Sequence, residues 1–356
     1  MVTYRLAEEK DYININNFYN KIYNSNRTIE QFYWEFHHCP YGKSIYVIAE
    51  DGQKIVGTNC VIPIQLTNQS QKTFLTGKSE DTLVDPAYRG QNIFYNIYDF
   101  LFLKCKEHGI QIIWGFTSAE KPFKKLGFSV PFRHQQSLAV NGIWKSFKYL
   151  SSLNSKNTAI QKFQILGLCI FSKLKYELGN IGSKKNDFKC SKNEDIIHQI
   201  DDLIKSNSQK NNNAFYIDQT PNFQNWRVYT NPNYSKIHTY GFYNSKDVLI
   251  GLIVLNTNKD SVAYIIQSSF SDVLSQKEKV SMLKHAINDI FSMGISIIRN
   301  WHFDTNQINK DEIEIYKAAN FIQLKKGIGF VWKEIYPVDL NPNDFFLSRI
   351  ATQGSI

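Results

Sequence analysis

The sequence has few cysteines, and they follow no pairing pattern. Cys39, Cys60, Cys105, Cys169 and Cys190 are odd in number, lie far apart and never form a C-x-x-C pair. Disulfide frameworks and zinc knuckles both need paired or closely spaced cysteines, so this distribution argues against both. We therefore expect buried, unreactive thiols, which agrees with a cytoplasmic protein.

Long apolar runs and a secretion signal are also missing. The longest apolar run in the middle of the chain covers only residues 165–171. When it is extended to 159–174, Lys162 and Lys173 interrupt it. A membrane span needs roughly 20 mostly apolar residues. The first residues enter a strand-like pattern without the charged and apolar regions of a signal peptide. We expect a cytoplasmic protein with no membrane partner.

Clustered basic residues are the third feature that the sequence lacks. The formal net charge is +9, but the charge is scattered, without an arginine-rich block or a basic stripe interleaved with aromatic residues. This argues against nucleic acid as a partner. The positive charge could attract a phosphorylated small molecule such as a nucleotide. It could equally reflect a genome biased toward lysine, asparagine and isoleucine codons.

The chain does contain an internal repeat. With 356 residues, 42% of them hydrophobic, it is long enough for two domains. The spacing from Trp34 to Pro40 equals that from Trp226 to Pro232, and a strand and a turn follow each pair. Later in each half comes an apolar strand opened by glycine, at 109–113 and 294–298. The common order of these features predicts two related α/β domains in tandem.

A tight polar loop in the first half carries the most specific signal. Residues 73–87 alternate like a strand, residues 88–92 form a polar turn, and a helical pattern begins at Ile93. A helix N-terminus after such a loop presents unpaired backbone N–H groups and the positive end of the helix dipole. Gly90 and Asn92 tolerate positive φ, which allows the loop to close around an anion. The pattern predicts a pyrophosphate site.

This loop resembles the coenzyme A pyrophosphate loop of the GNAT acyltransferase superfamily. Residues 84–93 read Val-Asp-Pro-Ala-Tyr-Arg-Gly-Gln-Asn-Ile. The family has a valine, an acidic residue with proline, and then Arg/Gln-x-x-Gly-x-Gly/Ala. Arg89 matches the leading position, Asn92 replaces the first glycine, and Phe94 stands at the final small residue. An aromatic residue there is similar to a subgroup of larger, two-domain GNAT proteins.

The resemblance implies an α/β fold of two tandem GNAT-like domains, each a mixed sheet flanked by helices. Residues 1–140 would form the acyl-CoA-binding domain and residues 141–205 a helical linker. Residues 206–334 would form a degenerate GNAT domain, because no Arg-Gly loop follows the strand at 260–268. Residues 335–356 would form a C-terminal tail.

The resemblance also implies the donor and the residues that hold it. The donor would be acyl-CoA, with no metal ion. Its pantetheine arm would insert where the strand at 110–116 splays away from the preceding strand. The residues expected to contact the donor are Leu83, Val84, Arg89, Gly90, Gln91, Asn92, Ile93, Phe94, Thr117 and Phe123.

Acyl transfer to an amine needs a base for the nucleophile and an acid for the departing thiolate. GNAT enzymes usually carry the base on the strand before the loop, where this chain has Glu80 and Asp81. Strand alternation does not decide between them, because a bulge would invert its phase. The usual thiolate acid, a tyrosine, is replaced by Phe123. The hydroxyls of Thr117 and Ser118 could support the thiolate instead.

The acceptor is expected in the cleft between the two domains. Trp34, His37 and His38 fall where the family builds its acceptor wall, and His302 and Tyr316 come from the second copy. Tyr316 occupies the place that matches the missing tyrosine. By resemblance, the acceptor would be the amine of a nucleotide-linked amino sugar in surface polysaccharide biosynthesis.

Two other functions stay open. One is an aminoacyl-tRNA-dependent ligase of the peptidoglycan-bridge type, which has twin GNAT-like domains but usually lacks a working coenzyme A loop. The other is a non-catalytic acyl-CoA-binding protein, which the phenylalanine at position 123 favours. The sequence does not indicate the acyl group or the number of subunits.

Overall fold

A computed structural model describes residues 1–68, 70–154, 156–179, 188–193, 196–208, 214–258, 260–303, 305, 307–324 and 327–351. The chain divides into two compact units, each built around its own sheet. The first comprises Met1–Arg133, Phe215–Pro232 and Ile328–Asp344, and the second comprises His134–Ala214, Asn233–Gly327 and Phe345–Ile356. Two mixed sheets flanked by helices confirm the predicted α/β fold class.

The bounds of the two units do not coincide with the predicted ranges. Strand β6 (Gln135–Val140) pairs with β12 (Ile297–His302) in the second sheet. Strand β14 (Gly329–Glu334) pairs with β5 (Ile112–Thr117) in the first sheet. The first half of the chain therefore supplies β6 to the second sheet, and the second half supplies β14 and β8 (Phe215–Ile217) to the first sheet. An alternating sequence identifies a strand but not the edge that it joins, so this exchange was not predicted.

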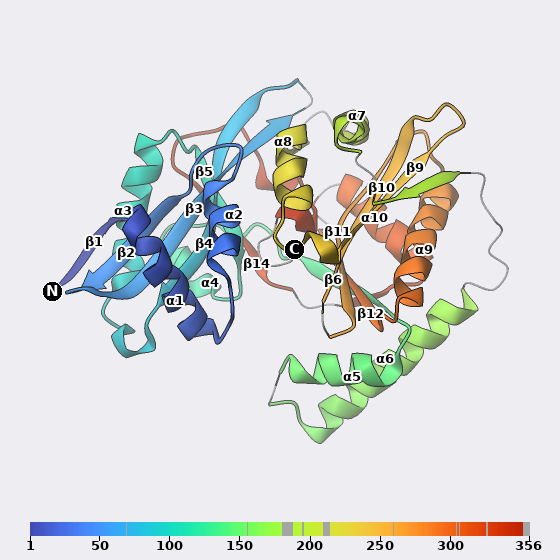
Figure 1. Ribbon diagram of the computed structural model, residues 1–356, viewed down its shortest axis with the longest axis horizontal. Helices are drawn as coiled ribbons and strands as arrows, with labels where there is room; N and C mark the ends of the chain where they lie inside the picture. The colour runs from blue at the N-terminus through green and yellow to red at the C-terminus, as the bar shows by residue number, and fades with distance from the viewer. Residues whose placement is uncertain are drawn as a thin grey trace. The chain divides into compact units, whose positions relative to one another are not determined.

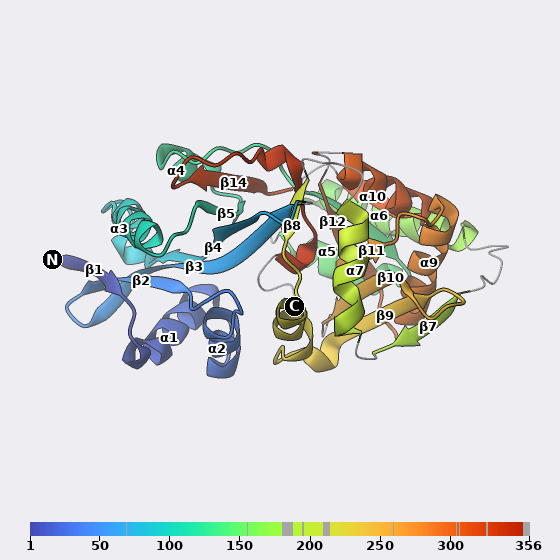
Figure 2. The ribbon, with the colours of Figure 1, turned by 90° about the horizontal axis from the view of Figure 1, so that it is seen from above.

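The first sheet has the order β1-β2-β3-β4-β5-β14, and β8 pairs with β3. The β4–β5 pair of this sheet is parallel, and the neighbouring β3–β4 and β5–β14 pairs are antiparallel. Figure 2 shows α1 and α2 on one side of the sheet and α3 on the other. The remaining bounds are β1 (Val2–Leu6), β2 (Ile45–Asp51), β3 (Lys54–Asn68), β4 (Thr73–Val84), β8 (Phe215–Ile217), α1 (Tyr12–Tyr23), α2 (Ile29–His37), α3 (Ile93–Glu107), α4 (Glu120–Lys125) and α8 (Pro221–Gln224).

The second sheet has the order β13-β6-β12-β11-β10-β9-β7. Its strands β6, β12, β11, β10 and β9 are labelled in Figure 1. Its β11–β12 pair is parallel, as β4–β5 is in the first sheet. None of the described helices is both long and apolar enough to cross a membrane. The remaining bounds are β7 (Lys189–Lys192), β9 (Ile237–Tyr243), β10 (Leu249–Thr257), β11 (Val262–Phe270), β13 (Ile322–Leu324), α5 (Ile143–Ser152), α6 (Ala159–Leu178), α7 (Ile197–Ser208), α9 (Gln276–Ser292) and α10 (Gln307–Ala318). Strand β15 (Phe345–Phe346) is not part of this sheet.

The two units repeat the same backbone conformations at matching positions, as the sequence repeats the same features. Gly109 and Gly294, which precede β5 and β12, have φ of 71° and 87°. Gly127 and Asn320, which follow α4 and α10, have φ of 81° and 70°. Glycine and asparagine are the residues that enter the left-handed region most easily, so each copy ends its helices in the same way.

Candidate active site

Strands β4 and β5 separate at the end of a short parallel ladder. Thr76, Gly77 and Lys78 pair with residues 112–114, whereas β4 continues to Val84 and β5 to Thr117. At the fork a Cβ on Gly115 would lie 3.2 Å from the carbonyl oxygen of Ser79, so a glycine permits the close approach. Beyond this point the two strands open, which agrees with the predicted splay.

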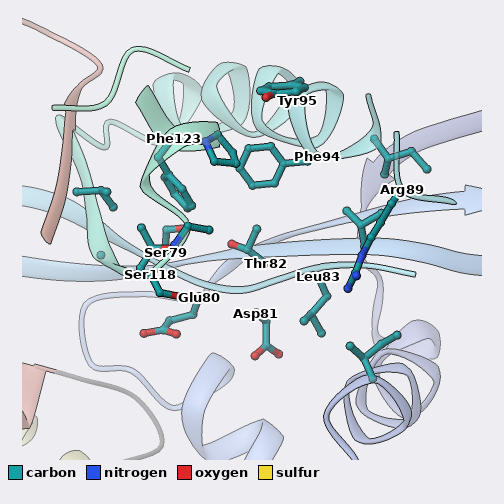
Figure 3. A pocket seen from close by; sticks show the side chains of 18 of the residues that line it. Ser79, Glu80, Asp81, Thr82, Leu83, Arg89, Phe94, Tyr95, Ser118 and Phe123 are labelled. Carbon is teal, nitrogen blue, oxygen red and sulfur yellow. The ribbon is translucent and has the colours of Figure 1, made fainter. Parts of the chain in front are cut away.

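A cavity of about 570 Å³ occupies this opening (Figure 3). It lies within the first unit, and Val331 of β14 contributes to its wall. Gln91 is exposed in the loop and does not line the cavity. The predicted residues that line it are Glu80, Asp81, Leu83, Val84, Arg89, Gly90, Asn92, Ile93, Phe94, Thr117, Ser118 and Phe123.

The loop after β4 ends in an open helix N-terminus. Gly90 and Asn92 have φ of 85° and 60°, which confirms the expected positive values. The side chain of Asn92 does not cap α3, and the first turn of α3 has no acidic residue. Backbone N–H groups at the start of this helix are therefore available to an anion. The guanidinium of Arg89, exposed beside them, adds a positive charge.

The matching helix of the second unit begins differently. Ser275 precedes α9, and its hydroxyl accepts a hydrogen bond from the backbone N–H of Glu278. The carboxylate of Glu278 in turn accepts one from the backbone N–H of Ser275 at 2.8 Å. The Ser275 hydroxyl also donates to this carboxylate at 2.6 Å, and together with the backbone N–H it lowers the pKa of Glu278, which holds it as an anion. The N-terminus of α9 is thus already occupied by the chain's own carboxylate.

Asp81 lies on a β-bulge in β4. The register against β3 shifts between Thr58 and Cys60, and Asp81 has φ of 47°. Its carboxylate accepts hydrogen bonds at 2.8 Å from both the Arg27 guanidinium and the Tyr46 hydroxyl. Burial opposes the charge of Arg27, but Asp81 together with Tyr46 and Glu35 outweighs it and raises the pKa of Arg27. Asp81 is therefore engaged in a buried ion pair.

Glu80 has a different environment. Its carboxylate pairs with the ammonium group of Lys78 on the same face of β4. Burial of Lys78, together with the nearby charge of Arg227, lowers its pKa to about 7. The side chain of Glu80 is 20% exposed, whereas that of Asp81 is 1% exposed. Figure 3 shows both carboxylates on the opposite side of β4 from Thr82. Glu80 is thus the more accessible of the two predicted bases.

A hydroxyl network on the α3 side of β4 was not predicted. The buried hydroxyl of Tyr98 lies 2.8 Å from that of Ser79 and 3.2 Å from that of Thr82. The amide of Asn59 donates to Thr82 at 2.8 Å. Ser79 and Thr82 line the cavity. In the sequence, the indication of this network was Tyr98, which places a hydroxyl group among the apolar residues that α3 buries.

Phe123 is a packing residue. Its ring contacts those of Phe94, Tyr98 and Phe128 with centroids 5.2–5.6 Å apart. Thr117 accepts a hydrogen bond from the backbone N–H of Ala119 at 3.0 Å. Ser118 is exposed at the end of β5. The predicted hydroxyls therefore stand at the cavity wall, whereas position 123 carries no proton donor.

The predicted acceptor residues of the first half lie outside this cavity. Trp34 is buried, and its indole N–H donates to the backbone carbonyl of Trp226 at 2.6 Å. The indole of Trp226 donates to the carbonyl of Trp34 at 2.7 Å. His37 packs against the ring of Tyr12, and His38 is exposed. None of these side chains lines the cavity.

The predicted residues of the second half belong to the second unit. Tyr316 is fully buried, and its hydroxyl donates to Ser268 at 3.0 Å. Ser268 donates to the carboxylate of Glu312 at 2.8 Å. His302 is buried with a nitrogen 2.5 Å from the hydroxyl of Ser137. Tyr316 and His302 take part in the interior of this unit.

Residues 3–130 match a family model described as an acetyltransferase (GNAT) domain. The match includes the splayed strands, the loop and the whole of α3. A search of curated protein sequences finds no match. The GNAT resemblance of the first half is thereby confirmed for the region that forms the cavity.

Solved structures with a similar fold extend over nearly the whole chain. A protein from Enterococcus faecalis V583 described as a probable N-acyltransferase has a TM-score of 0.66 and 10% identity, covering 94% of this chain and 73% of its own. A tandem GNAT protein from the clavulanic acid biosynthesis pathway has a TM-score of 0.59 and 10% identity, covering 95% and 100%. N-myristoyltransferase from Saccharomyces cerevisiae, with bound myristoyl-CoA, has a TM-score of 0.60 and 13% identity, covering 96% and 86%.

At these identities the likeness establishes a fold, that of two GNAT domains in tandem. The family match over residues 3–130 is to an acetyltransferase (GNAT) domain, and the solved structures add the fold alone. Within the described residues no group of three or more His, Cys, Asp or Glu side chains is arranged to hold a metal ion.

Proposed function

We propose that the chain transfers an acyl group from acyl-CoA to an amine, with the donor held in the cavity of the first unit. One observation carries the proposal: the opening between β4 and β5 ends at the uncapped N-terminus of α3. The pyrophosphate would contact the backbone N–H groups at Asn92 and Ile93 and the guanidinium of Arg89. The pantetheine arm would lie along Leu83 and Val84.

Glu80 is the proposed base. The incoming nitrogen forms a C–N bond with the thioester carbonyl, the C–S bond breaks, and the nitrogen gives its proton to the Glu80 carboxylate directly or through water. Protonation of Glu80 would remove the negative partner of Lys78. Glu80 lines the cavity and can then release this proton to water, which restores the carboxylate and its ion pair with Lys78.

The departing thiolate also needs a proton donor or a hydrogen-bond donor. The candidates are the hydroxyl groups on the α3 side of β4, two of which line the cavity. Burial raises the pKa of Tyr98, so its hydroxyl stays protonated at neutral pH. Through the hydroxyl of Ser79 at the cavity wall, Tyr98 can support the thiolate in place of the tyrosine that Phe123 replaces. Ser118 and Thr117 are the other hydroxyls at this wall.

For the acceptor we propose the amine of a nucleotide-linked amino sugar used in surface polysaccharide biosynthesis in the cytoplasm. The support is the sequence resemblance to larger tandem GNAT proteins and the net charge of +9, which favours an acceptor that carries a diphosphate.

Thermal unfolding with acetyl-CoA, longer acyl-CoAs and a panel of nucleotide-linked amino sugars tests the proposal. A ligand at about 100 times its Kd adds about 2.7 kcal/mol of stability. Stabilisation by an acyl-CoA and by one amino sugar would identify both substrates. Stabilisation by acyl-CoA without turnover of any amine would favour the non-catalytic alternative. No shift with any acyl-CoA would remove the proposed donor and favour the tRNA-dependent ligase.

A further inference from the structure

Helix α6 exposes an apolar stripe along its whole length. Its members are spaced by three, four or seven residues, apart from the adjacent Ile170 and Phe171, which places them on one helix face. It runs from residue 160 to residue 178, or about 27 Å of helix. Phe163, the most exposed member, is 77% accessible. The members are Ile160, Phe163, Ile170, Phe171, Leu174 and Leu178.

The opposite face of α6 already supplies the contacts with its own unit. Cys169 and Tyr176 are buried there, and Ile165 and Leu168 pack against the same cores. The exposed stripe is therefore additional to the face that anchors the helix. Soluble monomers rarely expose large contiguous apolar patches, and such patches commonly mark interaction sites.

Helix α5 extends the patch. It packs beside α6 (Figure 1), and Trp144 at its start is 72% exposed. Leu153, just after α5, is also exposed. We refer to residues 143–178 as the helical hairpin. Its exposed apolar side chains include both a tryptophan and two phenylalanines, which suit a boundary between water and lipid.

The charged residues of the hairpin are mostly basic. Residues 143–178 contain six lysines and one acidic residue, Glu177, which pairs with Lys173 at 2.9 Å. The other lysines are spread over both helices and the turn between them. Four of them are exposed and form no ion pair with another described residue: Lys145, Lys148, Lys156 and Lys162.

We infer that the hairpin docks the protein on a membrane surface that carries anionic lipid headgroups. The apolar stripe enters the boundary between headgroups and acyl chains, and the lysines contact the headgroup phosphates. The sequence expectation of no membrane partner rested on the lack of a spanning segment. Surface docking needs only one apolar face, so the absence of a span among the described helices does not oppose it.

The positive charge of the hairpin favours an anionic lipid surface over a second copy of the chain as its binding partner. A two-fold dimer through the hairpin would place the same patch of each copy against the other. The unpaired lysines of both copies would then face each other without counter-charges. An anionic lipid surface neutralises them instead, at about 1 kcal/mol for each lysine near the surface, or roughly fivefold in binding.

Co-sedimentation of the full chain with vesicles tests the inference. One set of vesicles is pure phosphatidylcholine, and the other contains about 30% phosphatidylglycerol, which is anionic. We expect binding to the anionic vesicles that weakens at high salt because the charges are screened. The double variant F163S/F171S should bind at least about tenfold more weakly, since two aromatic rings lose their burial. Replacing Lys145, Lys148 and Lys162 by Gln should weaken binding roughly fivefold for each lysine.

Leu103→Ser is the matched control, because Leu103 is 62% exposed on α3, outside the hairpin. It should bind vesicles as the parent chain does, and cooperative thermal unfolding checks that each variant is folded. Absence of vesicle binding by the parent chain would overturn the inference, as would equal losses for Leu103→Ser and F163S/F171S. A dimer in light scattering that F163S/F171S converts to a monomer, without vesicle binding, would assign the stripe to a second copy instead.

Discussion

The guanidinium of Arg27 donates a hydrogen bond to the carboxylate of Asp81 at 2.8 Å, and both side chains are almost completely buried. Arg27 also lies 3.7 Å from the centre of the Tyr19 ring. The pair fixes the β-bulge of β4 to the segment between α1 and α2. Residues on either side of the bulge, Glu80 and Thr82, consequently face opposite sides of the strand (Figure 3).

Asp81→Asn should destabilise the protein. The amide keeps the shape of the carboxylate but leaves the Arg27 charge buried without its counter-charge, which costs roughly 3–5 kcal/mol. Urea denaturation followed by tryptophan fluorescence measures the loss. A variant with unchanged stability that lacks activity would instead make Asp81 the base.

Glu80→Gln should leave the fold intact and slow the reaction. Glutamine cannot accept the proton of the nucleophile, so kcat should fall by about 10²–10⁴-fold. The loss of the carboxylate is tolerated at pH 8, because burial lowers the pKa of Lys78 to about 7 and its amine can stay neutral. Steady-state kinetics beside denaturation curves separates the two effects. Full activity in this variant would exclude Glu80 as the base.

Arg89→Glu should abolish acyl-CoA binding. The substitution places a carboxylate beside the pyrophosphate at the start of α3, where an anion is otherwise favoured. Isothermal titration calorimetry should give one acyl-CoA for each parent chain and no measurable binding for the variant. The stoichiometry is one because Glu278 already caps α9 in the second unit.

Lys246→Glu is the matched control for this experiment. Lys246 is exposed in the turn between β9 and β10, so the variant has the same change in net charge but leaves the loop unaltered. It should bind acyl-CoA as the parent chain does. Unchanged affinity in Arg89→Glu would contradict the assignment of the loop. Two bound acyl-CoA molecules for each parent chain would contradict the degenerate second domain.

The sequence predicted the features that depend on neighbouring residues. Gly90 and Asn92 indicated a loop with positive φ because that property belongs to the residue type. The environment of Asp81 was not predictable, since its partner Arg27 is 54 residues away. The environment of Trp34 was not predictable either. We expected Trp34 at the acceptor wall, but its indole donates a hydrogen bond to a residue 192 positions away.

The bounds of the units show the same distinction at a larger scale. The alternation of residues 135–140 indicates a strand, but the pairing of β6 with β12 depends on which sheet edge is available. Likewise β14 completes the first sheet although it lies near the end of the chain. Local patterns therefore identified the elements and the repeat, while the exchange of strands required the structure.

Glu312→Gln should change how stability depends on pH. Burial raises the pKa of Glu312 from 4.5 to about 7. Between these values the folded state binds a proton that the unfolded state has released. The resulting stabilisation is complete below about pH 4.5 and is lost as pH rises through about 7. Glutamine keeps a neutral side chain beside Ser268 at all pH values.

The variant should therefore match the parent chain at pH 4.5 and exceed its stability at pH 8 by about 3 kcal/mol. Denaturation curves at several pH values for both proteins measure this difference. A difference that does not vary with pH would show that Glu312 titrates normally.

Tyr98→Phe should lower kcat while acyl-CoA affinity stays within about twofold. The substitution removes the hydroxyl that lies 2.8 Å from Ser79, and with it the support that this hydroxyl gives the thiolate through Ser79, worth about tenfold or more. Lost hydrogen bonds to Ser79 and Thr82 cost about 1 kcal/mol each, so the variant should still fold.

Tyr95→Phe, on the same helix and also at the cavity, is the matched control. If both variants turn over alike, Tyr98 only supports the structure. If Tyr98→Phe alone is slow, and more so for donors with a poorer leaving thiol, the missing acid of position 123 is supplied from α3.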